Sequence, residues 1–202
     1  MSSYVLFFTT HGQKQRFKPI CIIIPQFFKK YNENSRQTEK ICICTENGAS
    51  SVLVADHNKI WQARKAFAEA VRAESLIVCK EDVVVPVDQE AALLDEILRL
   101  AKKYNLVTRI ASHAGDGNIH LDVLRKGFAD EGDEKQKVAA FEDKACQAAY
   151  ELGGAISGEH GIGQARKALF AKYTDPVELA LMKAVKQAWD PKNILNPGKI
   201  FD

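Results

Sequence analysis

The 202-residue sequence predicts an α+β domain in which helices cover a mainly antiparallel sheet. Three observations indicate this fold class. Residues 89–104 form a strong amphipathic helical pattern, and two extended apolar runs follow it at 106–112 and 119–124. A second long helical pattern then covers 134–152. The short glycine-containing loop between the extended runs favours a hairpin, and therefore antiparallel pairing.

The elements before this hairpin follow from apolar spacing. Residues 59–71 repeat apolar side chains at helical intervals and predict a helix. The β-branched runs 76–79 and 83–87 predict two short strands, and Pro86 suits the end of the second. The helix over 89–104 begins with acidic residues and ends with lysines, an order that complements the helix dipole.

The elements after the hairpin carry clear boundary residues. Gly153 and Gly154 follow the helix over 134–152 and predict left-handed cap residues. A short helix is expected at 164–173. The run Asp175-Pro-Val-Glu178 then combines an N-cap, a first-turn proline and a capping-box glutamate, so the last helix begins there.

Composition limits the class of protein. The chain has 46% hydrophobic and 27% charged residues, as a globular domain does. The net charge of +2 argues for neither nucleic acid nor an anionic membrane as the main partner, and no nucleic-acid partner is expected. Residues 1–40 carry seven basic and two acidic side chains, so we interpret 1–47 as an atypical basic leader and 48–202 as the domain.

The location is predicted to be cytoplasmic, with any membrane association passing through partner subunits. The longest apolar run, 20–28, contains Pro25 and is too short to span a bilayer, so no transmembrane segment is expected. The five cysteines show no disulfide-framework spacing, which favours unpaired thiols in a reducing compartment.

The candidate chemistry lies in the hairpin loop and in a later glycine-rich segment. His113 and His120 flank the loop 114–118, and paired strands would place their side chains about 5 Å apart on one face. Glu159 could add a third ligand and leave open positions on Zn²⁺ or Mn²⁺. The residues alone leave alternatives open: ordinary strand-end histidines, plain turn glycines, and a solvated Glu159–His160 pair.

Five motifs, in order, resemble the C-terminal domain of the FAD-linked oxidases, a family that includes glycolate oxidase, D-lactate dehydrogenase and D-2-hydroxyglutarate dehydrogenase. The three longest are His-Ala-Gly-Asp-Gly-Asn-Ile-His (113–120), Ser-Gly-Glu-His-Gly-Ile-Gly (157–163) and Asp-Pro-Lys-Asn-Ile-Leu-Asn-Pro-Gly-Lys-Ile-Phe (190–201). Trp61–Arg64 and Lys80–Pro86 resemble two further stretches. The likeness covers residues 48–202 and implies the cap (substrate) domain of that family.

The resemblance implies roles for eight side chains: metal ligation by His113, His120 and Glu159, proton abstraction by His160, substrate binding by Arg64 and Lys80, and contact with the flavin by Asn118 and Asn196. The chemistry is coherent, because a divalent metal (Zn or Mn) acidifies a hydroxyl group and an imidazole can remove its proton. Asp122 would repel a second substrate carboxylate. The expected substrate is therefore a small 2-hydroxy acid such as glycolate or D-lactate.

The expected function is the substrate-binding part of an FAD-dependent 2-hydroxy-acid oxidoreductase. Family members place an FAD-binding domain of roughly 150–200 residues before this region, and residues 1–47 do not resemble it. We therefore expect a truncated or split chain that is inactive alone. FAD would be held mainly by an absent domain or a separate FAD-binding polypeptide, and a bare flavin-facing surface would favour homo-oligomers.

Two alternatives come from other classes. A metal-dependent hydrolase could use the same His113, His120 and Glu159 to activate water, and would need no flavin. A non-catalytic binding module could retain the cap fold, and its role would survive loss of His160.

Overall fold

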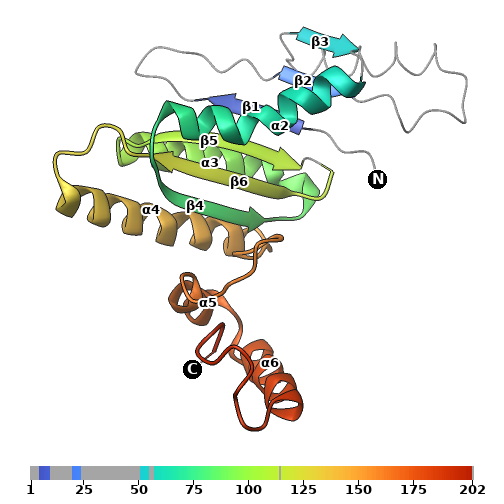
Figure 1. Cartoon of the computed structure of the whole chain (residues 1–202), viewed down its shortest axis with the longest axis vertical. Helices are drawn as coiled ribbons and strands as arrows, with labels where there is room; N and C mark the ends of the chain where they lie inside the picture. Colours follow the sequence, from blue (N-terminus) through green and yellow to red (C-terminus); the bar gives the residue numbers. More distant parts are fainter. Residues whose placement is uncertain (1–4, 10–19, 24–50, 55–56, 114, 202) are drawn as a thin grey trace, which may run out of the picture.

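The computed structural model describes residues 5–9, 20–23, 51–54, 57–113 and 115–201 (Figure 1). The described strands are β1 (Val5–Thr9), β2 (Ile20–Ile23), β3 (Ser51–Val54), β4 (Ile77–Val84), β5 (Val107–His113) and β6 (Asn118–Leu124). The described helices are α2 (His57–Glu74), α3 (Glu90–Lys103), α4 (Glu131–Glu151), α5 (Lys167–Tyr173) and α6 (Pro176–Trp189), with a 3-10 turn η2 (Val87–Gln89).

The strands form one six-stranded sheet in the order β3-β2-β1-β5-β6-β4. All neighbours pair antiparallel except β2 and β3, which are parallel. The α+β prediction with a mainly antiparallel sheet is therefore confirmed. Two strands that precede residue 48, β1 and β2, lie in this same sheet, and the domain boundary at that residue stays a prediction.

The predicted strands at 76–79 and 83–87 are in fact one strand, β4, so this prediction was wrong. The charged run Lys80-Glu-Asp82 separates the two predicted strands in the sequence. In the structure its side chains alternate between the two faces of the sheet, and each has a polar or charged partner there. Glu81 pairs with Arg166, and Lys80 lies 3.8 Å from Asp122.

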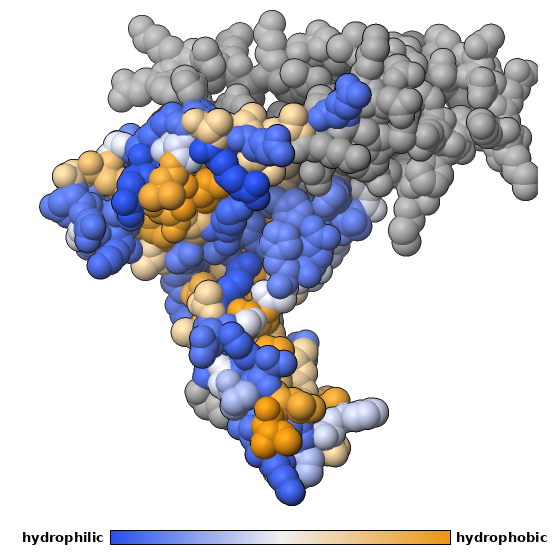
Figure 2. Space-filling view, in the orientation of Figure 1, coloured by the Kyte–Doolittle hydropathy of each residue, from blue (hydrophilic) through white to orange (hydrophobic). Residues whose placement is uncertain are grey.

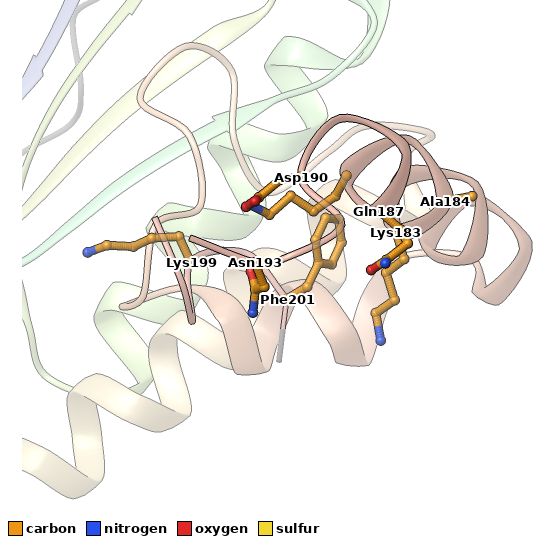
Figure 3. Close-up of a pocket in the computed structure, with 8 residues that line it drawn as sticks. Lys183, Ala184, Gln187, Asp190, Asn193, Lys199 and Phe201 are labelled. Atoms are coloured by element: carbon orange, nitrogen blue, oxygen red, sulfur yellow. The ribbon is translucent and has the colours of Figure 1, made fainter. Parts of the chain in front are cut away.

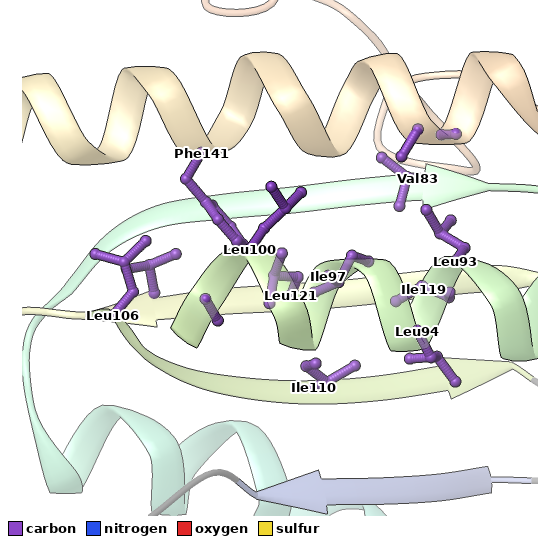
Figure 4. Packing of buried hydrophobic residues seen from close by; sticks show 14 of the residues in the cluster. Val83, Leu93, Leu94, Ile97, Leu100, Leu106, Ile110, Ile119, Leu121 and Phe141 are labelled. Carbon is purple, nitrogen blue, oxygen red and sulfur yellow. The ribbon is translucent and has the colours of Figure 1, made fainter. Parts of the chain in front are cut away.

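The hydrophobic core lies between one face of the sheet and the helices α3 and α4 (Figure 4). Strand alternation sends apolar side chains to this face. The largest fully buried ones include Phe141, Leu93, Ile97, Leu100, Ile110, Ile119 and Leu121. The opposite face of β4, β5 and β6 is thereby left for polar groups. Arg109 on that face binds Glu74 at the end of α2, with Nε 2.8 Å from the carboxylate.

Helix boundaries follow the local chemistry with one exception. Asp175 caps α6 by accepting the N–H of Val177 at 2.8 Å, as predicted. Gly153 takes the predicted left-handed conformation, with φ of 77°. Gly154 does not, and is needed for another reason: a Cβ there would lie 2.1 Å from the carbonyl oxygen of Val84, where the chain crosses β4.

The chain beyond residue 166 forms an arm that extends away from the sheet (Figure 1). Helix α6 carries exposed apolar side chains one turn apart: Val177, Leu181, Val185 and Trp189, each between 61% and 84% exposed. Figure 2 shows apolar side chains gathered on the surface of this arm. No helix in the described part of the chain has both the length and the apolar character required to cross a bilayer.

Candidate functional site

The hairpin β5–β6 places two imidazoles beside each other on the sheet face opposite α3 and α4. His113 pairs with Asn118 in the register, and His120 pairs with Ala111, so the two histidines are diagonal neighbours. Their ring centroids are 5.0 Å apart and the rings are nearly perpendicular, at 87°. The expected placement of both side chains on one face is therefore what the structure shows, although they are not direct cross-strand partners.

The segment 157–163 brings Glu159 and His160 to these imidazoles. Oε1 of Glu159 lies 3.1 Å from Nε2 of His120, and 3.7 Å from Nε2 of both His113 and His160. The ring of His160 stacks on that of His120, with centroids 5.1 Å apart. One ligand atom each from His113, His120 and Glu159 falls within 4.8 Å of the others, a separation suited to a shared cation. The three predicted ligands and the predicted base thus form one cluster.

Asp82 on β4 holds this glycine-rich segment in place, and sequence reasoning missed it. Its Oδ2 accepts backbone N–H groups from Gly158 at 3.1 Å, Glu159 at 2.9 Å and His160 at 2.7 Å. The hydroxyl of Ser157 also donates to it, at 3.2 Å. Burial raises the pKa of Asp82, but the N–H groups of His160 and Glu159 more than offset this, and the pKa lies below its ordinary value. The signal in the sequence that could have identified Asp82 was an acidic residue next to a run of β-branched residues.

Asp82 also faces His120. Its Oδ1 lies 3.4 Å from Nδ1 of His120, and neither atom has a hydrogen-bond partner among the described residues. Burial lowers the pKa of His120 below its ordinary value, and the neighbouring His113 lowers it further, although Asp82 and Glu159 act in the opposite direction. In metal centres a carboxylate commonly faces the second nitrogen of a ligating histidine. The contact between Oδ1 of Asp82 and Nδ1 of His120 therefore fits a divalent cation bound to Nε2 of His120.

Close packing explains the glycines around the cluster. A Cβ on Gly158 would lie 2.5 Å from the carboxamide of Asn118, and one on Gly117 would lie 1.9 Å from the carbonyl oxygen of Val85. Asn118 is itself buried, and its Oδ1 has no hydrogen-bond partner within the described structure. The predicted flavin-contacting Asn118 thus lies directly beneath the segment that carries Glu159.

Lys80 and Asp122 flank the cluster on the same face. They are register partners on β4 and β6, next to the pair formed by Asp82 and His120. Nζ of Lys80 lies 3.8 Å from Oδ1 of Asp122. Burial raises the pKa of Asp122, and the cation of Lys80 opposes this only in part. The predicted substrate-pocket lysine is therefore close to the histidines and partly paired with a carboxylate.

The contacts of the described residues do not include any between the cluster and the remaining two predicted residues. Arg64 lies in α2, and its side chain is outside the described residues. Asn196 follows α6 in the arm that extends from the sheet (Figure 1), with a φ of 51°. The roles expected for all eight side chains stay predictions.

A pocket of about 380 Å³ lies in the same arm, between α6 and the C-terminal segment (Figure 3). Lys183, Lys199, Asn193 and Phe201 line it together with Asp190, which is paired with Lys186. None of the eight predicted site residues lines this pocket. The His–Glu cluster on the sheet is therefore the candidate functional site.

Fold and site define an α+β domain that presents a histidine–carboxylate cluster at the end of a β-hairpin. The chain belongs to the FAD-linked oxidases, whose C-terminal domain matches residues 20–200. The resemblance drawn from the sequence motifs is confirmed by this match.

Three similar proteins show how much of a longer enzyme the chain corresponds to. It is 40% identical to D-lactate dehydrogenase of Anaerostipes hadrus over 78% of this chain and 34% of that protein. It is 34% identical to glycolate oxidase subunit GlcD of Bacillus subtilis, over 82% of this chain and 36% of that protein. It is 32% identical to D-2-hydroxyglutarate dehydrogenase of Stutzerimonas stutzeri, over 70% of this chain and 31% of that protein. The chain spans about a third of the length of these relatives.

Proposed function

We propose that this chain is the substrate side of an FAD-dependent 2-hydroxy-acid oxidoreductase that acts on glycolate or D-lactate. One observation carries the proposal: the carboxylate of Glu159 lies within 3.7 Å of the Nε2 atoms of three histidines. The three relatives support it, because each is named for a 2-hydroxy acid.

In this proposal His113, His120 and Glu159 hold a zinc or manganese ion. Such an ion, when bound, lowers the pKa of a coordinated substrate hydroxyl. Asp82 keeps the imidazole of His120 oriented and holds the backbone of Glu159 in place. Two of the three ligands lie on the hairpin strands β5 and β6, and the third lies on the loop 157–163. The hairpin therefore fixes two ligand positions, and the loop adds the third.

His160 would remove the hydroxyl proton. Its side chain is 60% exposed, so substrate can reach it, and its Nε2 lies 3.7 Å from Oε1 of Glu159. Stacking on His120 fixes the plane of the ring. FAD, when bound, accepts the α-hydrogen as hydride, and the protein supplies orientation.

Lys80 and Asp122 would set the substrate size. The exposed ammonium group of Lys80 can bind the substrate carboxylate. Asp122 lies on the same face and would repel a second carboxylate, as on a dicarboxylic 2-hydroxy acid. A small monocarboxylate therefore fits better.

The test combines the chain with the remainder of a related enzyme. The chain would be mixed with a form of the Anaerostipes hadrus D-lactate dehydrogenase that lacks the matched segment, and reduction of an artificial electron acceptor by D-lactate or glycolate would be followed. We expect turnover only in the mixture, and its loss in His160→Ala but not in the exposed-lysine control Lys135→Ala.

Other outcomes separate the alternatives. Hydrolysis of an ester or amide substrate by the chain without flavin would favour a metal-dependent hydrolase. Turnover that survives His160→Ala would remove this residue from the proposal. FAD bound tightly to the chain alone would contradict the expectation that another polypeptide or domain supplies it.

A further inference from the structure

We propose that a second divalent metal site, suited to Zn²⁺, lies on the core side of β4 and is formed by Cys79, Glu81 and Glu142. It is separate from the His–Glu cluster, which lies on the opposite face of the same strand. The proposal does not depend on the oxidoreductase function.

The three side chains converge from two elements. Cys79 and Glu81 alternate with Lys80 and Asp82 along β4, so strand alternation sends them toward α4. Glu142 on α4 meets them there. Sγ of Cys79 lies 3.1 Å from Oε1 of Glu142 and 3.8 Å from Oε1 of Glu81. One ligand atom from each residue falls within 4.8 Å of the other two.

These separations match tetrahedral zinc. Bonds of about 2.3 Å to sulfur and about 2.0 Å to oxygen at a tetrahedral angle place the two ligand atoms about 3.5 Å apart. The two measured sulfur–oxygen distances bracket this value. Little movement is therefore needed to enclose an ion.

Charge favours a cation at this position. Glu81 is only 3% exposed, and a second carboxylate, that of Glu142, lies beside it. Arg166 binds Oε2 of Glu81, which leaves Oε1 on the side of Cys79. Once the Cys79 thiol has lost its proton to a bound metal, the thiolate and the two carboxylates would carry three negative charges, which one divalent ion together with Arg166 would balance. A buried charge set of this kind is stable only when it is neutralised.

The sulfur ligand selects the metal. Magnesium and calcium prefer oxygen ligands alone, whereas zinc accepts thiolate and carboxylate together. Burial raises the pKa of the Cys79 thiol, so without metal the thiol stays protonated and donates to Glu142. Zinc binding would displace that proton. The bound ion would tie β4 to α4 directly behind Asp82.

Cobalt provides a probe that separates the two sites. A thiolate ligand to Co²⁺ gives a near-ultraviolet charge-transfer band, and the His–Glu cluster contains no sulfur. We expect the full chain titrated with Co²⁺ to show this band, and His120→Ala to retain it. The matched thiol control is Cys146→Ser, because Sγ of Cys146 contacts Glu81 from the Oε2 side, 3.8 Å away. This control should also retain the band.

Two variants decide the outcome. Cys79→Ser should abolish the band, and Glu142→Gln should weaken Co²⁺ binding at least about tenfold while leaving the fold intact, since Glu142 is partly exposed. If Cys79→Ser does not fold, Glu142→Gln gives the answer alone. Absence of the band, its persistence in Cys79→Ser, its loss in Cys146→Ser, or unchanged affinity in Glu142→Gln would each overturn the proposal.

Discussion

Asp82 accepts the backbone N–H of His160 at 2.7 Å, across a sequence separation of 78 residues. This contact joins β4, at one edge of the sheet, to the loop that carries a predicted ligand and the predicted base. The same carboxylate faces Nδ1 of His120. The buried carboxylate of Asp82 therefore positions both His120 on the hairpin and the loop that carries Glu159 and His160.

The first prediction concerns stability. Asp82→Ala removes four hydrogen-bond contacts to one charged oxygen and should lower the free energy of unfolding by on the order of 3 kcal/mol. Urea denaturation would measure it. The exposed acid Asp88 gives the control, and Asp88→Ala should stay within about 0.5 kcal/mol of the parent. Equal losses in both variants would contradict the anchoring role.

The second prediction concerns metal affinity. Asp82→Asn should weaken Mn²⁺ binding by roughly 10–100-fold, because the amide is a poorer partner for Nδ1 of His120 than a carboxylate. Calorimetric titration with Mn²⁺ measures this and avoids the thiol-containing cluster, which does not suit manganese. Asp122→Asn removes a carboxylate from the same face and should leave affinity nearly unchanged. Parent-like affinity in Asp82→Asn would count against the site.

Substrate choice provides the third prediction. In the mixture of this chain with the remainder of the related enzyme, Asp122→Asn should raise kcat/KM for D-2-hydroxyglutarate relative to D-lactate by about fivefold, since a repulsion on the order of 1 kcal/mol is removed. Asp122→Glu keeps the charge and should keep the original ratio. A ratio that does not change in Asp122→Asn would show that this residue does not set substrate size.

The fourth prediction concerns the apolar stripe on α6. Leu181→Lys combined with Val185→Lys should reduce self-association of the chain, because both side chains are more than 60% exposed and their burial between copies would be lost. Sedimentation velocity would measure the shift. Gln187→Lys adds the same kind of charge on another face of the helix and should have little effect. A parent chain that stays monomeric at high concentration would contradict the prediction.

The fifth prediction is a pH dependence in the C-terminal arm. Asp190 accepts the N–H groups of Ile194 at 3.0 Å and Leu195 at 2.9 Å, and its hydrogen bond with Lys186 holds its pKa below the ordinary value of 3.8. Its stabilising contribution is therefore complete above about pH 4 and disappears as the pH falls through the lower folded-state pKa.

Amide hydrogen exchange at Leu195 would report this loss, provided that rates are corrected for intrinsic pH effects. Protection should fall in the parent chain as the solution is acidified. In Asp190→Asn, protection should be lower at neutral pH and show little further change in acid. Protection that is independent of pH in the parent would remove Asp190 from this role.

Several elements were predictable because their information is local. The helix over 89–104 and the hairpin strands at 106–112 and 119–124 repeat apolar side chains at their own periods. Asp175 and Pro176 mark a helix start by chemistry within three residues. β4 was predicted as two strands because its charged centre is stabilised by partners far away in sequence, and those partners leave no local pattern.

The sequence by itself determined the α+β class, most element boundaries and the residue types of the candidate site, since period and motif are properties of neighbouring residues. Only the tertiary structure decided which atoms meet. Pairing of β4 with β6 places Asp82 opposite His120, and the return of segment 157–163 to β4 brings Glu159 and His160 beside them. These contacts depend on strand register and on buried hydrogen bonds between distant segments, which no local periodicity encodes.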